Sequence, residues 1–254
     1  GTSIAGIGDL DGDGVNDIAV GASHDDMDEN GVADGANNRG AVRIMFMNTN
    51  ASVKSCVEIN DSTANGPDLA SSDFFGWSVA NIGDLNGDGV NDLASGTTGV
   101  NAEPAGANRG AVNIMFMNTD GSVQSTVEIN TETTNGPTLA NTDKFGYGVT
   151  EIGDLDGNCV NDLAVGAPQD DMDENGVADG ANNRGTVHII FMEDENPDVD
   201  CVTSSAPSAV SSPCSRHIIL GNCGTIAIND DVYRIIDPWT NVPTTEVLVG
   251  EPVT

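Results

Sequence analysis

The chain has 254 residues, and its 40 acidic against 8 basic side chains give a formal net charge of −32. A charge of this sign and size excludes nucleic-acid backbones and anionic membrane surfaces as natural partners, and it favours divalent cations. The 31 glycines and the low aromatic content of 4% favour short strands joined by turns. We therefore expect an all-β protein of one large or two smaller domains, and the lack of any long apolar run predicts no membrane insertion.

The first element in the chain is an acidic loop that leads directly into an apolar run, GDLDGDGVNDIAVGA at 8–22. Oxygen donors occupy every second position, and Gly14 stands at position 6, where a calcium loop bends sharply. An oxygen-only donor set is typical of Ca²⁺ rather than of zinc or copper. Val20 replaces the glutamate that closes an EF-hand loop, and no amphipathic helix flanks the loop, so the metal should join two strands. The expected ligands are Asp9, Asp11, Asp13, Asp17 and the carbonyl of Val15.

The same loop returns twice, at 83–96 and 153–167. In the third copy Cys159 replaces the glycine of position 6, and a side chain there resists a positive φ. We expect this third site to be the weakest, or to be held in shape by a disulfide from Cys159. The expected ligands are Asp84, Asn86, Asp88, the carbonyl of Val90 and Asp92 in the second loop, and Asp154, Asp156, Asn158, the carbonyl of Val160 and Asp162 in the third.

An identical insert, DDMDENGVADGANNRG, occurs at 25–40 and 170–185 and repeats the same donor spacing. Its flanks are less regular, so a solvated acidic loop is the alternative interpretation. With the inserts, the sequence predicts about five Ca²⁺ ions, which would bring the net charge to about −22. The expected insert ligands are Asp26, Asp28, Asn30, the carbonyl of Val32 and Asp34, and then Asp171, Asp173, Asn175, the carbonyl of Val177 and Asp179.

The units repeat with a period of 70 to 75 residues, as the spacing of Asp9, Asp84 and Asp154 shows. After each insert an RG turn leads into AVRIMFMN, AVNIMFMN or TVHIIFME, and short NTNAS or NTDGS segments between apolar alternations predict β-hairpins. Each unit therefore has about four strands. A four-stranded meander cannot bury both faces alone, so the units should pack face to face as propeller blades do.

The succession FGxSV, IGDLDGDGVNDLAVGA and RGAVxIMFMN resembles the FG-GAP repeat of integrin α-subunit β-propellers and of many bacterial surface proteins. The resemblance covers residues 1–193, as three repeats at about 1–70, 71–140 and 141–193. It implies a β-propeller-like array of four-stranded blades with Ca²⁺ in hairpin loops. Family propellers usually have about seven blades and the first repeat lacks its opening Phe, so this chain as it stands should not close a ring.

The remaining sequence divides into a Ser- and Pro-rich linker at 194–214 and a C-terminal β segment at 215–254 with three expected strands. Five cysteines fit an oxidising, extracellular or cell-surface location and allow two disulfides with one odd thiol, while the lack of CxxC argues against zinc. Sequons at Asn50 and Asn60 allow N-glycosylation, although chance explains them equally well. The start inside a repeat, without Met, predicts a mature or excised piece.

Catalytic motifs such as GxSxG and HExxH do not occur, and the three histidines are isolated, with His188 expected to be an ordinary exposed residue. We therefore expect no enzyme, but a calcium-binding extracellular structural protein, a glycoprotein if its sequons are used. Its expected partners are copies of itself, joined into a filament by strand addition through 215–254, or other extracellular proteins. The alternatives are a cell-adhesion module that binds a protein or glycan on its loop face, and an accessory propeller of a larger enzyme. The sequence does not identify the ligand.

Overall fold

The structure is a computed structural model that divides into two units, Gly1–Ala206 and Pro207–Thr254. All elements in its described part are β-strands, so no described segment provides a helix that could cross a membrane. The described residues are 1–26, 38–100, 108–158, 160–170 and 184–193, together with the backbone of 225–229, 232–236 and 243–248.

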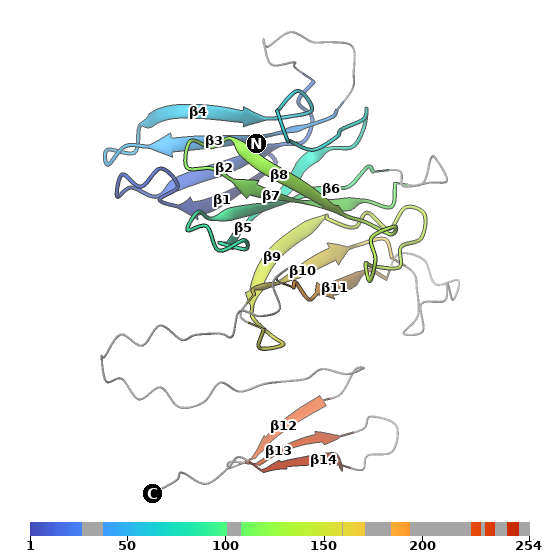
Figure 1. Cartoon of the computed structure of the whole chain (residues 1–254). Helices are drawn as coiled ribbons and strands as arrows, with labels where there is room; N and C mark the ends of the chain where they lie inside the picture. The colour runs from blue at the N-terminus through green and yellow to red at the C-terminus, as the bar shows by residue number, and fades with distance from the viewer. Residues whose placement is uncertain are drawn as a thin grey trace, which may run out of the picture. The chain divides into compact units, whose positions relative to one another are not determined.

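The first two repeats each form a four-stranded antiparallel sheet in which the strands follow in chain order (Figure 1). We call these sheets blade 1 and blade 2. This arrangement confirms the all-β class and the four-stranded unit expected from the repeat. The strands are β1 (Ser3–Gly8), β2 (Asp17–Ala22), β3 (Ala41–Met47) and β4 (Val53–Ile59) in blade 1, and β5 (Phe75–Gly83), β6 (Asp92–Thr97), β7 (Ala111–Met117) and β8 (Val123–Ile129) in blade 2.

The third repeat forms a sheet of three described strands, which we call blade 3. Its order is β9-β10-β11, again antiparallel, with Val165 of the middle strand opposite both Val149 and His188. These strands correspond to the first three of the other blades. Their bounds are β9 (Gly148–Gly153), β10 (Asp162–Ala167) and β11 (Thr186–Ile190).

The hydrophobic core of the first unit lies between the blades. Ile44 of β3 belongs to one buried cluster with Phe75 and Met115 of blade 2, and Ile114 of β7 belongs to a second cluster with Phe145 of the next repeat. All six residues of β6 are buried because blade 2 has a neighbour on each face, whereas burial alternates along β2 of blade 1. Packing between the blades therefore supplies the burial that a single meander lacks.

The Phe-Gly pair that opens each complete repeat attaches it to the preceding blade. Phe75 donates its backbone N–H to the carbonyl of Arg39 at 2.8 Å, and Phe145 does the same to Arg109 at 2.8 Å. Both phenylalanine side chains are fully buried, and short parallel bridges join each to the glycine of the RG turn. The Phe-Gly and Arg-Gly motifs are thus two halves of one contact between neighbouring blades.

A glycine in the second strand of the preceding blade makes room for this contact. A Cβ atom built on Gly96 would lie 1.8 Å from the carbonyl oxygen of Gly146, and one on Gly21 would lie 2.0 Å from that of Gly76. The equivalent Gly166 of blade 3 has nothing closer than 3.7 Å. The glycine is therefore required where another blade follows.

The second unit contains a separate antiparallel sheet of order β12-β13-β14. Its three strands agree with the three expected in the tail, although the first begins only at residue 225. The division into a linker at 194–214 and a β segment at 215–254 stays a prediction. The strands are β12 (Thr225–Asn229), β13 (Val232–Ile236) and β14 (Pro243–Leu248).

Replacing the buried glycine of blade 2 should destabilise the protein. Gly96→Ala places a methyl group against the Gly146 carbonyl, and such overpacking should lower the free energy of unfolding by about 2 kcal/mol. Gly166→Ala is the matched control and should be neutral or slightly stabilising, because its site is open. Urea unfolding measures both variants, and equal losses would show that the contact between the blades does not set the requirement.

Candidate metal centre

The acidic loop of blade 1 connects β1 to β2 and is held by hydrogen bonds to its own backbone. The carboxylate of Asp9 accepts the N–H groups of Asp13 and Gly14, both at 2.8 Å. Gly14 has a φ of 89°, as expected for position 6, where other residues are strained. The loop is therefore folded around the carboxylate of its first aspartate.

The last aspartate of the loop ties it to the rest of the blade. Asp17 is buried, and its two carboxylate oxygens accept the N–H of Leu10 at 3.0 Å and of Met47 at 2.8 Å. Met47 ends β3, so this carboxylate links the loop to the third strand. Asp92 and Asp162 repeat this arrangement with the equivalent backbone groups: Asp92 with Leu85 and Met117, and Asp162 with Leu155 and Met192.

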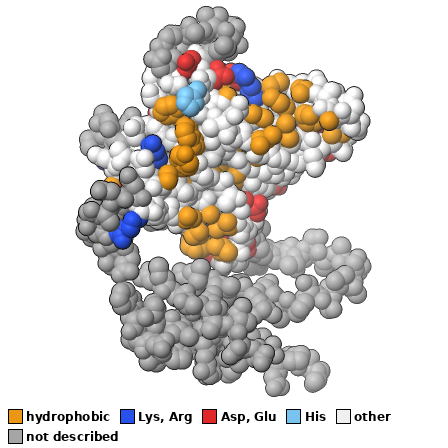
Figure 2. Space-filling model, turned by 180° about the vertical axis from the view of Figure 1, so that it is seen from behind, with side chains coloured by type: hydrophobic (Ala, Val, Ile, Leu, Met, Phe, Trp, Pro, Cys, Tyr) orange, Lys and Arg blue, Asp and Glu red, His pale blue; other side chains and the backbone are white. Residues whose placement is uncertain are grey.

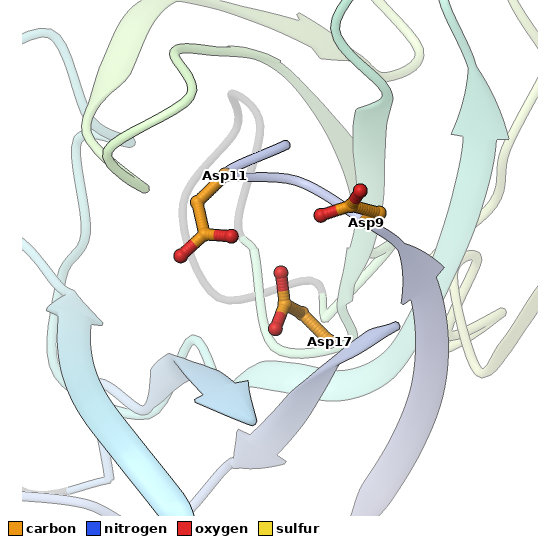
Figure 3. A group of neighbouring side chains, drawn as sticks. All are labelled: Asp9, Asp11 and Asp17. Carbon is orange, nitrogen blue, oxygen red and sulfur yellow. The ribbon is translucent and has the colours of Figure 1, made fainter. Parts of the chain in front are cut away.

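Three carboxylates converge in the first loop and three in the third. Figure 3 shows Asp9, Asp11 and Asp17 turned toward one another, and one oxygen of each lies within 4.8 Å of the others. Two ligands of the same Ca²⁺ ion, each about 2.4 Å from it, lie at most about 5 Å apart, so the groups are close enough to share an ion. In the second loop Asn86 replaces one carboxylate, yet the hydrogen bonds of Asp84 match those of Asp9. The third-loop group is Asp154, Asp156 and Asp162.

Asp13 lies outside the convergent group and pairs with a lysine instead. The Nζ atom of Lys54, on β4, is 2.6 Å from one oxygen of Asp13 and 2.7 Å from one of Asp11. Hydrogen bonding to this ammonium group is the main reason that the pKa of Asp13 is lowered, and the two carboxylates raise the pKa of Lys54. In blade 2 the neutral Gln124 takes the place of Lys54, with its Oε1 3.3 Å from the amide nitrogen of Asn86.

The other expected ligands are only partly placed. In the third loop Asn158 donates its side-chain N–H to the carbonyl of Met192 at 2.7 Å, and Cys159 lies outside the described residues. In the first insert Asp26 accepts the N–H of Asn38. Ligation by Asp13, Asp88 and the carbonyls of Val15, Val90 and Val160 stays a prediction. The remaining insert ligands lie outside the described residues: Asp28, Asn30, Val32, Asp34, Asp171, Asp173, Asn175, Val177 and Asp179.

Burial raises the pKa values of two aspartates. Desolvation raises the pKa of Asp92 to about 6, against the lowering effect of the N–H groups of Met117 and Leu85. Desolvation also raises the pKa of Asp73 to about 6, although the N–H of Ala70 opposes it. Without a cation these carboxyl groups therefore hold a proton more tightly than in water.

Sequence reasoning missed two features. Asp73 and Asp143, two residues before each Phe-Gly pair, are buried and accept the N–H groups of the alanines three residues earlier. The repeated Asp at this spacing was the available signal. His188 is not an ordinary exposed residue, so that expectation was wrong: its ring packs edge-on against Phe145 and its Nε2 lies 3.2 Å from Asp170. The cause is Phe145, the opening residue of the third repeat, which covers the ring.

Comparison with known proteins agrees with these repeats. The FG-GAP repeat family matches residues 1–45 and 75–114, so the chain carries FG-GAP repeats. It is 32% identical to Integrin alpha-PS5 of Drosophila melanogaster over 160 residues, which are 63% of this chain and 14% of that protein. Integrin alpha pat-2 of Caenorhabditis elegans is 34% identical over 134 residues, which are 50% of the chain and 10% of that relative. The chain thus spans only a small part of these relatives.

Stability without metal should decrease as the pH rises through about 6. The folded pKa values of Asp73 and Asp92 lie above the ordinary 3.8, so the folded state binds protons more tightly than the unfolded chain. Their contribution is fully present below about pH 4 and is lost above about pH 6. Urea unfolding in EDTA at pH 5 and pH 7 measures the difference. Asp73→Asn should weaken the pH dependence of the free energy of unfolding while leaving the acidic loops unchanged. A free energy of unfolding that rises with pH would contradict the expectation.

Proposed function

We propose that this chain is an extracellular, non-enzymatic, calcium-binding module of adhesion type, built from FG-GAP blades. The observation that carries the proposal is the convergence of Asp9, Asp11 and Asp17 in one loop and of the equivalent carboxylates in the third. Similarity to integrin alpha chains supports the extracellular and adhesive parts of the proposal. Millimolar calcium outside cells would fill sites of modest affinity.

The calcium ion would act as a structural element. When bound, it supplies positive charge that offsets the repulsion among the loop carboxylates. The chain's own residues do the rest: Asp9 orders the loop backbone, and Asp17 connects the loop to the end of β3. Three such loops and two inserts give about five sites in the proposal.

A catalytic role has little support among the described residues. Ser23 places its hydroxyl 3.0 Å from Nδ1 of His24, which resembles part of a nucleophile and base pair. However, Ser23 is fully buried, and its hydroxyl is also hydrogen-bonded to the hydroxyl of Thr2 at 2.8 Å. A substrate could not reach this oxygen, so the pair is better explained as a structural contact.

The edge opposite the acidic loops carries a row of aromatic rings. The ring of His24 lies 5.3 Å from that of Phe74, Phe74 lies 6.1 Å from Trp77, and Trp77 lies 5.2 Å from Tyr147. β5 begins at Phe75 and ends beside its acidic loop, so the rings and that loop lie at opposite ends of the strand. Tyr147 is exposed and Trp77 is half-buried, and tryptophan and tyrosine are enriched among binding hot spots. We propose that a protein or glycan ligand contacts this row.

Assembly by strand addition is a second candidate function. β12 and β14 are the outer strands of their sheet, and an outer strand can pair with a strand from another chain. This observation favours the proposal that residues 215–254 join a neighbouring subunit.

Calcium should raise the thermal stability of the protein and chelation should lower it. At a hundredfold excess over its dissociation constant, an ion adds about 2.7 kcal/mol per site to the free energy of unfolding. Calorimetry with calcium and with EDTA measures the change, and Asp11→Ala should reduce the gain. A melting temperature that EDTA does not change would show that the loops are not metal sites.

Lys54 and Gln124 provide a matched test of the individual loops. Lys54→Gln should raise the calcium affinity of the first loop, because the ammonium group competes with a cation for Asp11 and Asp13. Gln124→Lys should lower the affinity of the second loop for the same reason. Isothermal titration of both variants is the measurement, and unchanged affinities would mean that the side chain swings away when calcium binds.

The aromatic row should affect ligand binding but not calcium binding. Trp77→Ala removes the ring that contacts both Phe74 and Tyr147, so adhesion of the protein to extracellular-matrix proteins or glycans should fall at least tenfold. Calcium titration and melting in the same variant control for folding. Full adhesion by a folded Trp77→Ala protein would show that the aromatic row does not contact the ligand.

A further inference from the structure

The hairpin between β3 and β4 carries an Asn-Ala-Ser sequon at its tip. All residues of the tip, 48–52, are exposed. The side-chain oxygen Oδ1 of Asn50 accepts the N–H of Ser52 at 3.0 Å and its hydroxyl at 2.7 Å. No described residue accepts a hydrogen bond from the amide nitrogen Nδ2 of Asn50. The nitrogen to which a sugar would be attached is therefore accessible, and the turn presents the asparagine and the serine together.

The exposure of this position does not depend on the place of blade 1 in the array. Blade 2 has a described blade on each face, yet Asp120, the equivalent of Asn50, is exposed. Asp120 accepts the N–H of Ser122 at 3.0 Å and its hydroxyl at 2.6 Å, so the two turns have the same internal contacts. The neighbouring blade covers only the next residue, because a Cβ atom built on Gly121 would lie 3.1 Å from the ring of Phe46. A further repeat packed against blade 1 in the same way would leave Asn50 accessible.

The second sequon, which begins at Asn60, lies in a different environment. Asn60 follows the end of β4 and is only 4% exposed. Its Nδ2 donates to Oε1 of Glu58 at 3.1 Å, and its Oδ1 accepts the N–H of Ser62 at 2.9 Å. A sugar on this nitrogen would break the bond to Glu58 and would pull the side chain out of its buried site. The fold therefore distinguishes two sequons that the sequence alone presents as equivalent.

We propose that Asn50 is a site of N-linked glycosylation and that Asn60 stays unmodified in the folded protein. The proposal rests on the proposed extracellular location, because sequons are modified in secreted proteins. The donor is an oligosaccharide attached to a lipid through pyrophosphate. The bond between C1 of its first sugar and the pyrophosphate breaks, a bond between C1 and Nδ2 of Asn50 forms, and the lipid pyrophosphate and one Nδ2 proton are released.

The tip and the aromatic row lie at opposite ends of the strands. β3 ends at Met47, whose N–H binds Asp17 of the first acidic loop, so the tip of the hairpin lies at the loop end of blade 1. Hydrophobic side chains, which favour contacts with other proteins, gather in patches on the face seen in Figure 2. Among the described residues, none of the exposed large hydrophobic side chains belongs to the tip. A glycan on Asn50 should therefore leave the proposed ligand contact unchanged.

Mass spectrometry of the full chain, directed into the secretory pathway of a eukaryotic cell by a cleavable signal peptide, tests the proposal. We expect one glycan per chain, with occupancy of Asn50 at least tenfold higher than that of Asn60. Asn50→Gln should abolish the glycan, whereas Ser62→Ala, which removes the second sequon but keeps Asn60 in place, should not change it. Asp120→Asn is the matched gain of a site, because it creates Asn-Gly-Ser in the equivalent turn of blade 2. This variant should carry a second glycan.

Two results would overturn the proposal. A folded chain from this pathway without a glycan on Asn50 would show that the tip is not an acceptor. Occupancy of Asn60 equal to or above that of Asn50 would show that burial in the fold does not select the site. Thermal melting confirms that each variant is folded. Calcium titration and adhesion of the same protein are separate measurements, so calcium binding or adhesion can fail while Asn50 still carries its glycan.

Discussion

The close approach of backbones at paired glycines is the constraint on which the arrangement of the blades depends. A carbonyl of one blade lies where a side chain on the preceding blade would have to be, at Gly21 with Gly76 and at Gly96 with Gly146. Only glycine allows this distance, and the approach brings the adjacent phenylalanine into the space between the sheets. The glycine in the second strand of one blade and the Phe-Gly start of the next repeat are therefore parts of one contact, which is why both recur with the period of the repeat.

Burial in such an array is a property of a blade's position rather than of its sequence. Ile44, Ile114 and Ile189 occupy the same place in three similar strands, yet only the first two are buried. A sheet that has one neighbour keeps half of its apolar surface in contact with water, and a free energy of about 25 cal/mol per Å² favours covering it. Among the described residues, blade 2 has a neighbour on each face, whereas blades 1 and 3 each have a described neighbour on one face.

The repeat allowed the four-stranded unit to be predicted, because the hairpin segments and the donor spacing are local signals. Contacts between distant residues could not be predicted. Asp17 was expected as a ligand, but its bond to Met47 spans thirty residues. Lys54 comes to Asp11 only because β4 returns beside the first loop. His188 was expected to be exposed because Arg43 and Asn113 occupy its position in the other repeats, and no local pattern shows its contact with Phe145.

The third acidic loop is physically connected to the exposed apolar side chains of blade 3, Val187, Ile189 and Phe191. Asp162 accepts the N–H of Met192 at 3.0 Å, and Met192 follows Phe191, one of these three residues. The same carboxylate group lies in the convergent cluster of the third loop. An ion held there would fix Asp162, and through it the chain segment that presents Phe191. Asp162 thus links the convergent carboxylates of the third loop to the segment that presents Phe191, which ties the conformation of the loop to the surface beside it.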